Sequence, residues 1–138
     1  MIFLDSWVWL EYVFEGDKWR DAEAAIERAN TADAGGIVAA TVVAEVSYRI
    51  RRARDAETAS EAIEAIRAMD HVEVLPVTDE IAEFGAELRD RYYQRRELEL
   101  SYADAIHVAM AASVTECEAL YSGDPDFEAI DEIETVVL

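Results

Sequence analysis

The chain has 138 residues, of which 52% are hydrophobic, and a formal net charge of −19 at pH 7. This size and apolar content predict one domain over residues 1–138, large enough to bury roughly two thirds of its unfolded surface. The single Cys117 excludes an intramolecular disulfide framework and favours a reducing cytoplasm, and no apolar run has the length of a membrane span or the basic start of a signal peptide.

Short apolar runs and helix-type patterns alternate along the whole chain. The pattern predicts strands at residues 1–4, 37–40, 72–77, 119–121 and 134–137. It predicts helices, caps included, at residues 5–14, 19–30, 41–54, 56–69, 78–96 and 101–114. This order favours an α/β three-layer sandwich with a mainly parallel five-stranded sheet flanked by helices.

Four acidic residues stand within or directly after apolar segments: Asp5, Glu45, Asp104 and Asp124. Removing a lone carboxylate from water costs several kcal/mol unless a partner compensates for the lost hydration. Asp5 and Asp124 follow predicted strands, and ligands of open α/β sheets gather beyond the carboxyl ends of strands. Because Mg²⁺ and Mn²⁺ prefer oxygen ligands, we expect the four acids to share such an ion.

Each acid also has an ordinary structural interpretation. Asp5 is a candidate N-cap, Glu45 and Asp104 would favour the positive end of a helix dipole, and Asp124 precedes Pro125 in a turn. Asp104 is the hardest to explain in this way, because its helix is mostly Ala, Ile, Val and Met and the sequence nearby offers no Lys or Arg.

Four segments resemble the motifs of PIN-domain ribonucleases, in particular the VapC-type toxins of prokaryotic toxin–antitoxin pairs. They are IFLDS at 2–6, TVVAEV at 41–46, SYADAIHVA at 101–109 and YSGDPDF at 121–127. The resemblance implies that the four acids bind the metal, with Asp126 as an auxiliary acid. It also implies supporting roles for Ser6 and Ser122. Gly123 departs from the family, which usually has a bulkier residue there, and we expect it to loosen the turn that presents Asp124.

The resemblance implies a metal-dependent endoribonuclease that acts on single-stranded or looped RNA and leaves a 5′-phosphate and a 3′-hydroxyl. We expect Asp5 and Asp104 to hold the principal ion, Glu45 to orient the attacking water, and Asp124 with Asp126 to hold a second ion. The implied partners are RNA, a second copy of the chain, and an antitoxin whose peptide lies in a groove of the toxin. Two other functions stay open: an inactive PIN-like binding module, and a phosphatase or phosphoaspartyl receiver with acids at strand ends.

The net charge of −19 argues against RNA binding, which usually requires a basic surface. Arginines nevertheless form two clusters beside the predicted ligands, one at residues 49–54 after Glu45 and one at residues 89–96 before Ser101. Four of them are candidates for phosphate contacts: Arg49, Arg52, Arg95 and Arg96. The alternative is that these arginines pair with nearby acids or with helix C-termini. Only one lysine, Lys18, accompanies the many acids, a composition that predicts a high-salt cytoplasm or, alternatively, a generally acidic mesophilic protein.

Two further kinds of side chain, a histidine and several aromatic residues, are candidates for a role in catalysis or binding. We expect His107 to be a core or helix-packing histidine rather than a general base. Trp7, Trp9 and their aromatic neighbours are expected in core packing or a protein interface, whereas Tyr92 and Tyr93, beside an arginine cluster, are the better candidates for base stacking.

Overall fold

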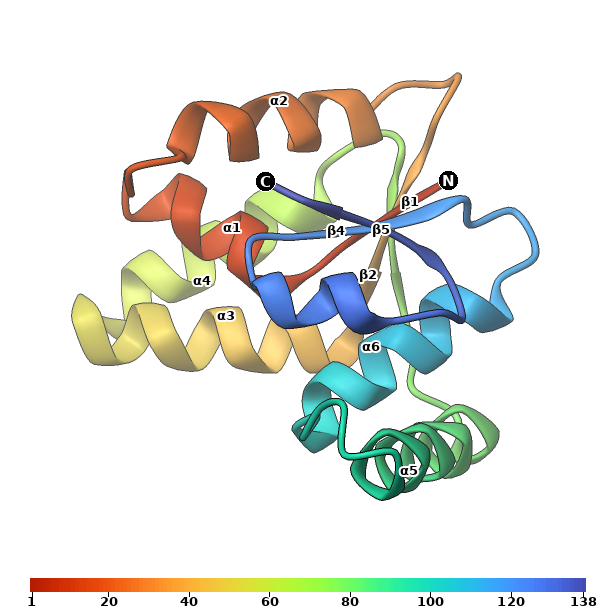
Figure 1. The fold of residues 1–138 in the computed structure, drawn as a ribbon. Coiled ribbons are helices and arrows are strands. Elements are labelled where there is room, and N and C mark those ends of the chain that lie inside the picture. The colour runs from red at the N-terminus through yellow and green to blue at the C-terminus, as the bar shows by residue number, and fades with distance from the viewer.

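The computed structural model describes residues 1–138 and contains one five-stranded sheet in which every neighbouring pair of strands is parallel. The strand order is β3-β2-β1-β4-β5 (Figure 1). The strands are β1 (Ile2–Leu4), β2 (Gly36–Ala39), β3 (Val72–Leu75), β4 (Ala119–Ser122) and β5 (Glu134–Val137). The predicted α/β architecture is therefore confirmed, with a sheet that is wholly rather than mainly parallel.

Six α-helices and one 3₁₀ helix connect the strands. They are α1 (Ser6–Val13), α2 (Trp19–Ala29), α3 (Ala40–Ala53), α4 (Ala56–Arg67), α5 (Asp79–Gln94), α6 (Tyr102–Ser113) and η1 (Pro125–Ala129). Figure 1 shows α2 on one side of the sheet and α5 and α6 on the other, which makes the sheet the middle of three layers. None of these helices combines the length and the apolar character needed to cross a membrane.

The central strand β1 explains why the sequence begins with an uninterrupted apolar run. Phe3 and Leu4 are fully buried, as expected for a parallel strand covered by helices on both faces. The core continues through β2, β4 and the inner faces of the helices. It includes Val42 and Val46 of α3 and Val108 of α6, all of them without exposed surface. Helices from both halves of the chain therefore pack against the strand that leads to Asp5.

Two local expectations were wrong in detail. Helix α3 begins at Ala40 with Ala39 as its N-cap, so Thr41 lies inside the helix and does not cap it. The segment after Asp124 is more than a turn, because residues Pro125–Ala129 form the 3₁₀ helix η1 with Asp124 as its N-cap. Because Thr41 does not cap α3, its hydroxyl is available for a contact beyond its own helix.

The strand register places the two strand-end motifs side by side. Leu4 of β1 pairs with Tyr121 of β4, and the Asp5 amide donates a hydrogen bond to the Tyr121 carbonyl at 3.0 Å. Asp5 and Ser122, each one residue further along, consequently meet at the carboxyl edge of the sheet. This is the edge at which α/β folds commonly bind ligands.

Candidate functional site

Asp5 occupies the N-cap position of α1, yet its side chain caps no backbone amide. The carboxylate is 3% exposed and turns toward the interior of the carboxyl edge. Its Oδ1 lies 3.0 Å from Nδ1 of His107, and its Oδ2 accepts a hydrogen bond of 2.8 Å from the Ser122 hydroxyl. Helix capping therefore does not account for this aspartate, because both oxygens are engaged with side chains far away in the sequence.

His107 is a core histidine, as expected from the sequence, but its contacts with the candidate site were not expected. It is fully buried and packs beside Phe3, but it also bridges two other elements. Its Nδ1 faces Asp5, and its Nε2 lies 2.9 Å from Oγ1 of Thr41. A proton on Nδ1 would be donated to Asp5, and Nε2 would then accept the Thr41 hydroxyl. The sequence contained one indication of this position: His107 follows Asp104 by three residues, so both side chains lie on the same side of α6.

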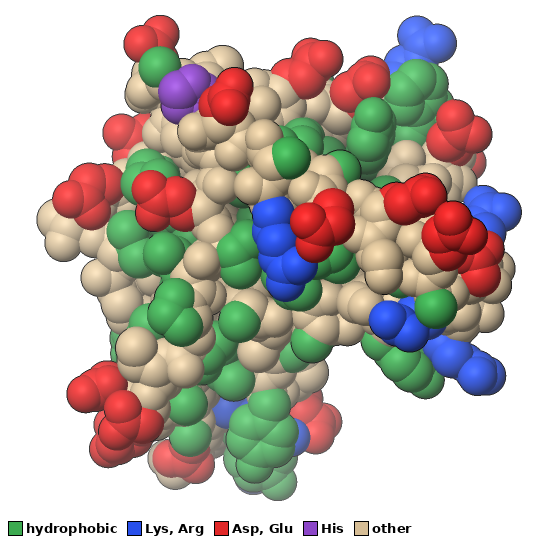
Figure 2. Space-filling view, turned by 180° about the vertical axis from the view of Figure 1, so that it is seen from behind, with side chains coloured by type: hydrophobic (Ala, Val, Ile, Leu, Met, Phe, Trp, Pro, Cys, Tyr) green, Lys and Arg blue, Asp and Glu red, His purple; other side chains and the backbone are tan.

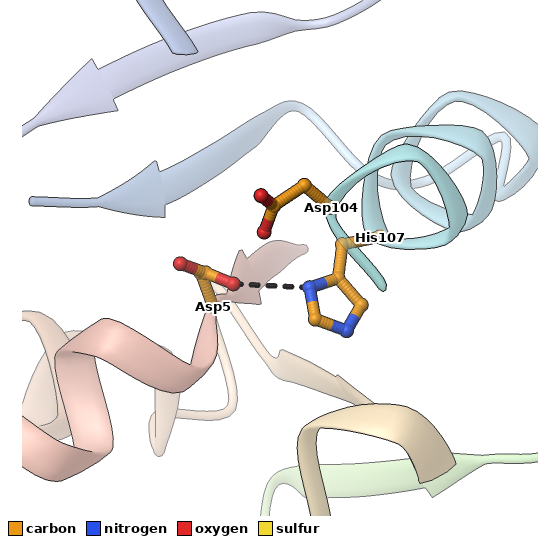
Figure 3. A group of neighbouring side chains, drawn as sticks. All are labelled: Asp5, Asp104 and His107. Carbon is orange, nitrogen blue, oxygen red and sulfur yellow. Dashed lines mark hydrogen bonds and ion pairs between the residues drawn. The ribbon is translucent and has the colours of Figure 1, made fainter. Parts of the chain in front are cut away.

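Asp104 lies in the first turn of α6, where its amide donates to the Ser101 hydroxyl at 3.1 Å. Figure 3 shows Asp104 and His107 projecting from α6 toward Asp5 at the end of β1. One potential ligand atom from each of these three residues lies within 4.8 Å of the others. Asp5, Asp104 and Asp124 also line one cavity of about 300 Å³. The structure thus brings three of the four predicted acids to a common space.

Glu45 approaches the same group from α3. Its Oε1 is buried, has no hydrogen-bond partner, and lies 3.5 Å from Nε2 of His107. Burial raises the pKa of the Glu45 carboxyl, His107 opposes this, and the charges of Asp5 and Asp104 raise it further. An unpartnered buried carboxylate oxygen is costly, and such an oxygen is suited to bind a cation.

The pKa of Asp104 is also raised, first by burial and then by the charges of Asp5 and Asp124, while Ser101 and His107 oppose the shift. The charges of neighbouring acids therefore make Glu45 and Asp104 harder to ionise. A divalent cation would remove that repulsion, and carboxylate oxygens are the ligands that Mg²⁺ and Mn²⁺ prefer. The residues present fit such an ion.

Ser122 connects two of the acids. Its buried hydroxyl donates to Asp5 and accepts the amide of Asp124 at 3.1 Å. Asp124 in turn accepts the Asp126 amide at 2.9 Å through its Oδ1, so it caps η1 as well as lining the cavity. Asp126 is exposed, and its side chain does not line the cavity. The structure does not bring Asp126 to the other acids.

Two positions beside the acids gain a structural explanation. Ser6, the first residue of α1, is buried against the cavity, and its hydroxyl lowers the pKa of Glu45. Gly123 has the ring of Trp7 where a side chain would start, since an added Cβ would lie 2.1 Å from Cε2 of that ring. The space at position 123 is filled by the indole, so this turn is packed rather than loosened.

The two arginine clusters differ in their surroundings. Arg49 is exposed and lines the acidic cavity, and Arg52 is exposed on the following turn of α3. Arg95 lies 3.8 Å from Asp131, and Arg96 lines a separate cavity together with Tyr93 and Glu99. Neighbouring arginines of the second cluster are engaged as well: Arg91 pairs with Glu132 at 2.7 Å and Arg89 stacks on Tyr102. Local partners therefore account for most of the second cluster.

Comparison with known proteins identifies the family of this chain. The family described as "PIN domain" matches residues 2–133, which is nearly the whole chain. The chain belongs to the PIN-domain family. A search of curated proteins found no match to this PIN domain.

Solved structures share its fold at low sequence identity. The crystal structure of VapC20 from Mycobacterium tuberculosis, titled a sarcin-ricin loop cleaving toxin, is 23% identical with a TM-score of 0.76, covering 97% of this chain and 99% of that one. VapBC2 from Rickettsia felis, bound to promoter DNA, is 16% identical with a TM-score of 0.76, covering 100% and 99%. DNA-bound VapBC from Salmonella typhimurium is 16% identical with a TM-score of 0.74, covering 99% and 96%. At these identities the likeness concerns the fold of the PIN domain.

Proposed function

We propose that this PIN domain is a metal-dependent endoribonuclease and the toxin of a type II toxin–antitoxin pair. The observation that carries the proposal is the single cavity lined by Asp5, Asp104 and Asp124 at the carboxyl edge of the sheet. Glu45 adds a buried carboxylate oxygen that has no partner. Family membership and the fold shared with VapC structures support ribonuclease activity of this kind.

Asp5, Asp104 and Asp124 would hold a Mg²⁺ or Mn²⁺ ion, with Glu45 completing the set. Such an ion, when bound, supplies a water of lowered pKa and neutralises phosphate charge during phosphodiester hydrolysis. Asp126 is exposed beside Asp124, and we assign it an auxiliary role through water.

The chain's own side chains fix and extend this site. His107 and Ser122 each bond one oxygen of Asp5, which holds that carboxylate in one orientation. The raised pKa of Glu45 suits a group that orients the attacking water and takes up its proton. Arg49 is the one basic side chain that lines the cavity and is placed to contact a substrate phosphate, with Arg52 following on the same helix.

The proposed partners follow from the same features. VapBC complexes among the solved structures support an antitoxin as partner, and a basic antitoxin side chain would suit the acidic cavity. We also propose a homodimer, as the family resemblance implies. RNA as substrate and a single free cysteine, Cys117, favour the reducing cytoplasm as the place of action.

Acidic side chains are spread over the face of the molecule that Figure 2 shows, with few Lys and Arg among them. A net charge of −19 in so small a protein implies strong self-repulsion in dilute buffer. We propose that the protein works in a salt-rich cytoplasm, where the repulsion is screened within about 3 Å at 1 M ionic strength.

RNA cleavage in molar KCl, with Mn²⁺ or with EDTA, tests the nuclease proposal. Asp5→Asn and Asp104→Asn should abolish metal-dependent cleavage while circular dichroism shows a retained fold. Glu64→Gln is the matched control, because Glu64 is an exposed acid whose ion pair with Arg67 lies on α4. Cleavage that persists undiminished in both aspartate variants would overturn the proposal.

A metal titration separates the nuclease from an inactive binding module. An ion that binds only the native state at 100 times its dissociation constant raises the unfolding free energy by about 2.7 kcal/mol. We expect Mn²⁺ to raise the melting temperature of the native protein and to have little effect on Asp104→Asn. The absence of a shift at millimolar Mn²⁺ favours the binding module, because an ion that binds the native state must stabilise it, and turnover of p-nitrophenyl phosphate favours a phosphatase.

A further inference from the structure

We propose that Trp7 is a binding surface for an unpaired nucleobase of the RNA substrate, next to the acidic cavity. The inference rests on the proposed nuclease function, since it concerns the same cavity. Trp7 follows Asp5 by two residues and lies on α1. It lines the cavity of about 300 Å³ that Asp5, Asp104 and Asp124 also line. A base on Trp7 would therefore bring its own phosphate to the acids and their metal.

The cavity has a composition that suits a nucleotide better than an ion alone. One part is acidic, and another part is apolar and consists of Trp7, Leu10 and Phe14. Arg49 adds a positive charge at the same cavity. Its volume is at the lower end of the roughly 300–1,000 Å³ typical of small-ligand sites. A metal site by itself needs no aromatic surface, whereas single-stranded nucleic acids are commonly bound by stacking their bases on aromatic rings.

The absence of a side chain at Gly123 leaves the space that the indole of Trp7 occupies. A Cβ at this position would lie 2.1–2.3 Å from three atoms of the Trp7 ring, far closer than any real contact. Any other residue at position 123 would therefore displace the ring. The glycine and the tryptophan act as a pair: the missing side chain at 123 lets the ring lie directly on the loop that carries Asp124.

That loop is held in a fixed position relative to the acids. Ser122 donates to Asp5 and accepts the amide of Asp124, so the backbone on both sides of Gly123 is tied to the site. Trp7 is tied from its other side, because it follows Asp5 at the start of α1. A stacking surface of this kind is oriented before the substrate arrives, and such ordering reduces the entropic cost of binding.

The other aromatic residues are less suited to this role. Trp9 and Tyr92 are buried, with 3% and 0% exposure, which excludes Tyr92 as the base-stacking residue expected from the sequence. Tyr102 is exposed, but the cavity that it lines, beside Arg89, contains none of the four predicted acids. Tyr93 borders other cavities, to which none of the four predicted acids contributes. Phe14 also lines the acidic cavity, but the guanidinium of Arg54 lies 5.8 Å from the centre of its ring. Trp7, whose side chain is partly buried, is therefore the aromatic residue best placed for this role.

Nucleoside monophosphates test the inference without cleavage, because they contain no phosphodiester bond. The probes are 2-aminopurine riboside 5′-monophosphate and its 3′-isomer, whose fluorescence falls when the base stacks, with ribose 5-phosphate as the base-free control. Binding is measured in molar KCl with Mg²⁺. We expect at least one isomer to be quenched and to bind more tightly than ribose 5-phosphate, and the better isomer identifies the side of the cleaved bond.

Three variants assign the effect to the ring. Trp7→Ala should weaken nucleotide binding about 5- to 150-fold, the range that alanine substitution of stacking residues gives. Trp7→Phe should retain most of the binding and quenching. Gly123→Ala should behave like Trp7→Ala, because its methyl group displaces the indole. Affinity for ribose 5-phosphate and the rise in melting temperature on addition of Mn²⁺ should stay near native values in Trp7→Ala, which would show that the metal site is intact, although the loss of core packing lowers the melting temperature itself.

The outcomes distinguish this inference from the nuclease proposal. Normal RNA cleavage together with unchanged nucleotide binding and quenching in Trp7→Ala overturns the stacking site and leaves the nuclease intact. Quenching that depends on Trp7 in a protein that cleaves no RNA supports the site and overturns the nuclease. If Trp7→Ala loses only the binding of an antitoxin peptide, the ring serves a protein partner and the inference is wrong.

Discussion

Asp5 and His107 stand 102 residues apart in the sequence and meet at 3.0 Å in the protein interior. Through the second nitrogen of the imidazole the contact continues to Thr41, so one side chain joins the end of β1 to α3 and α6. Asp5, His107 and Thr41 form one hydrogen-bonded series. Removing one member leaves a polar group of its neighbour without a partner. The orientation of the Asp5 carboxylate therefore depends on His107 as well as on Ser122.

We expect His107→Phe to lower the affinity for Mn²⁺ about 10- to 100-fold, the usual effect of removing a residue that orients a metal ligand. The ring volume is retained, but Asp5 and Thr41 lose their partner. His107→Gln keeps an amide that can donate to Asp5 and should fall between the native protein and His107→Phe. Isothermal titration with Mn²⁺ measures the effect. His71→Phe is the control, because His71 is exposed and its hydrogen bonds are made by its backbone amide and carbonyl.

The pH dependence of stability should report the raised pKa values of Glu45 and Asp104. A carboxyl with a raised pKa binds its proton more tightly in the folded than in the unfolded chain. Its contribution to stability is thus complete below the unfolded pKa, near pH 4, and is lost as the pH rises through the folded value. In EDTA, Asp104→Asn should match the native protein at low pH and become more stable than it above this window.

Chemical denaturation across this pH range, with and without metal, provides the measurement. Adding Mn²⁺ should reverse the order at neutral pH, because the ion stabilises the native protein and the asparagine variant binds it poorly. A native protein that is more stable than Asp104→Asn in EDTA at neutral pH would contradict the interpretation that Asp104 is destabilised by burial and neighbouring charge.

Tyr92 joins α5 to the segment before β5. Its hydroxyl donates to Glu132 at 2.6 Å and accepts the amide of Asp131 at 2.9 Å, and burial together with Glu132 raises the pKa of Tyr92 to about 12. Tyr92→Phe removes the hydrogen bonds to Oε2 of Glu132 and to the Asp131 amide, although Arg91 still pairs with the other oxygen of Glu132, and it should lower the unfolding free energy by about 1–3 kcal/mol in urea denaturation. The adjacent Tyr93 is 67% exposed, and Tyr93→Phe should change the unfolding free energy by less than about 0.5 kcal/mol.

The melting temperature of the native protein should rise steadily with KCl, from dilute buffer to molar concentrations. With 31 acidic against 12 basic residues, most of the benefit comes from screening of like charges. An equal ionic strength of NaCl should act similarly, whereas sucrose, which has no charge, should lack the screening component. A melting temperature independent of KCl below about 1 M would contradict adaptation to a salt-rich cytoplasm.

Local sequence patterns predicted most of the fold because they reflect local physics. The apolar run 2–4 predicts a buried strand, and the structure has β1 there. Thr78 caps α5 and Ser101 caps α6, as their positions in the sequence predict. Thr41 has the same appearance in the sequence but lies one residue inside α3. Its hydroxyl has a tertiary partner instead, and no local pattern shows which of two polar contacts a threonine will make.

The sequence by itself determined that four acids interrupt apolar segments of an alternating α/β chain, because burial of a carboxylate has a high cost wherever it occurs. Only the tertiary structure decided which of them meet. Strand register and helix packing bring Asp5, Asp104 and Asp124 to one cavity, leave Asp126 at the surface, and add His107 and Trp7 to the site. Contacts between residues a hundred positions apart depend on how whole elements pack, and no short segment contains that information.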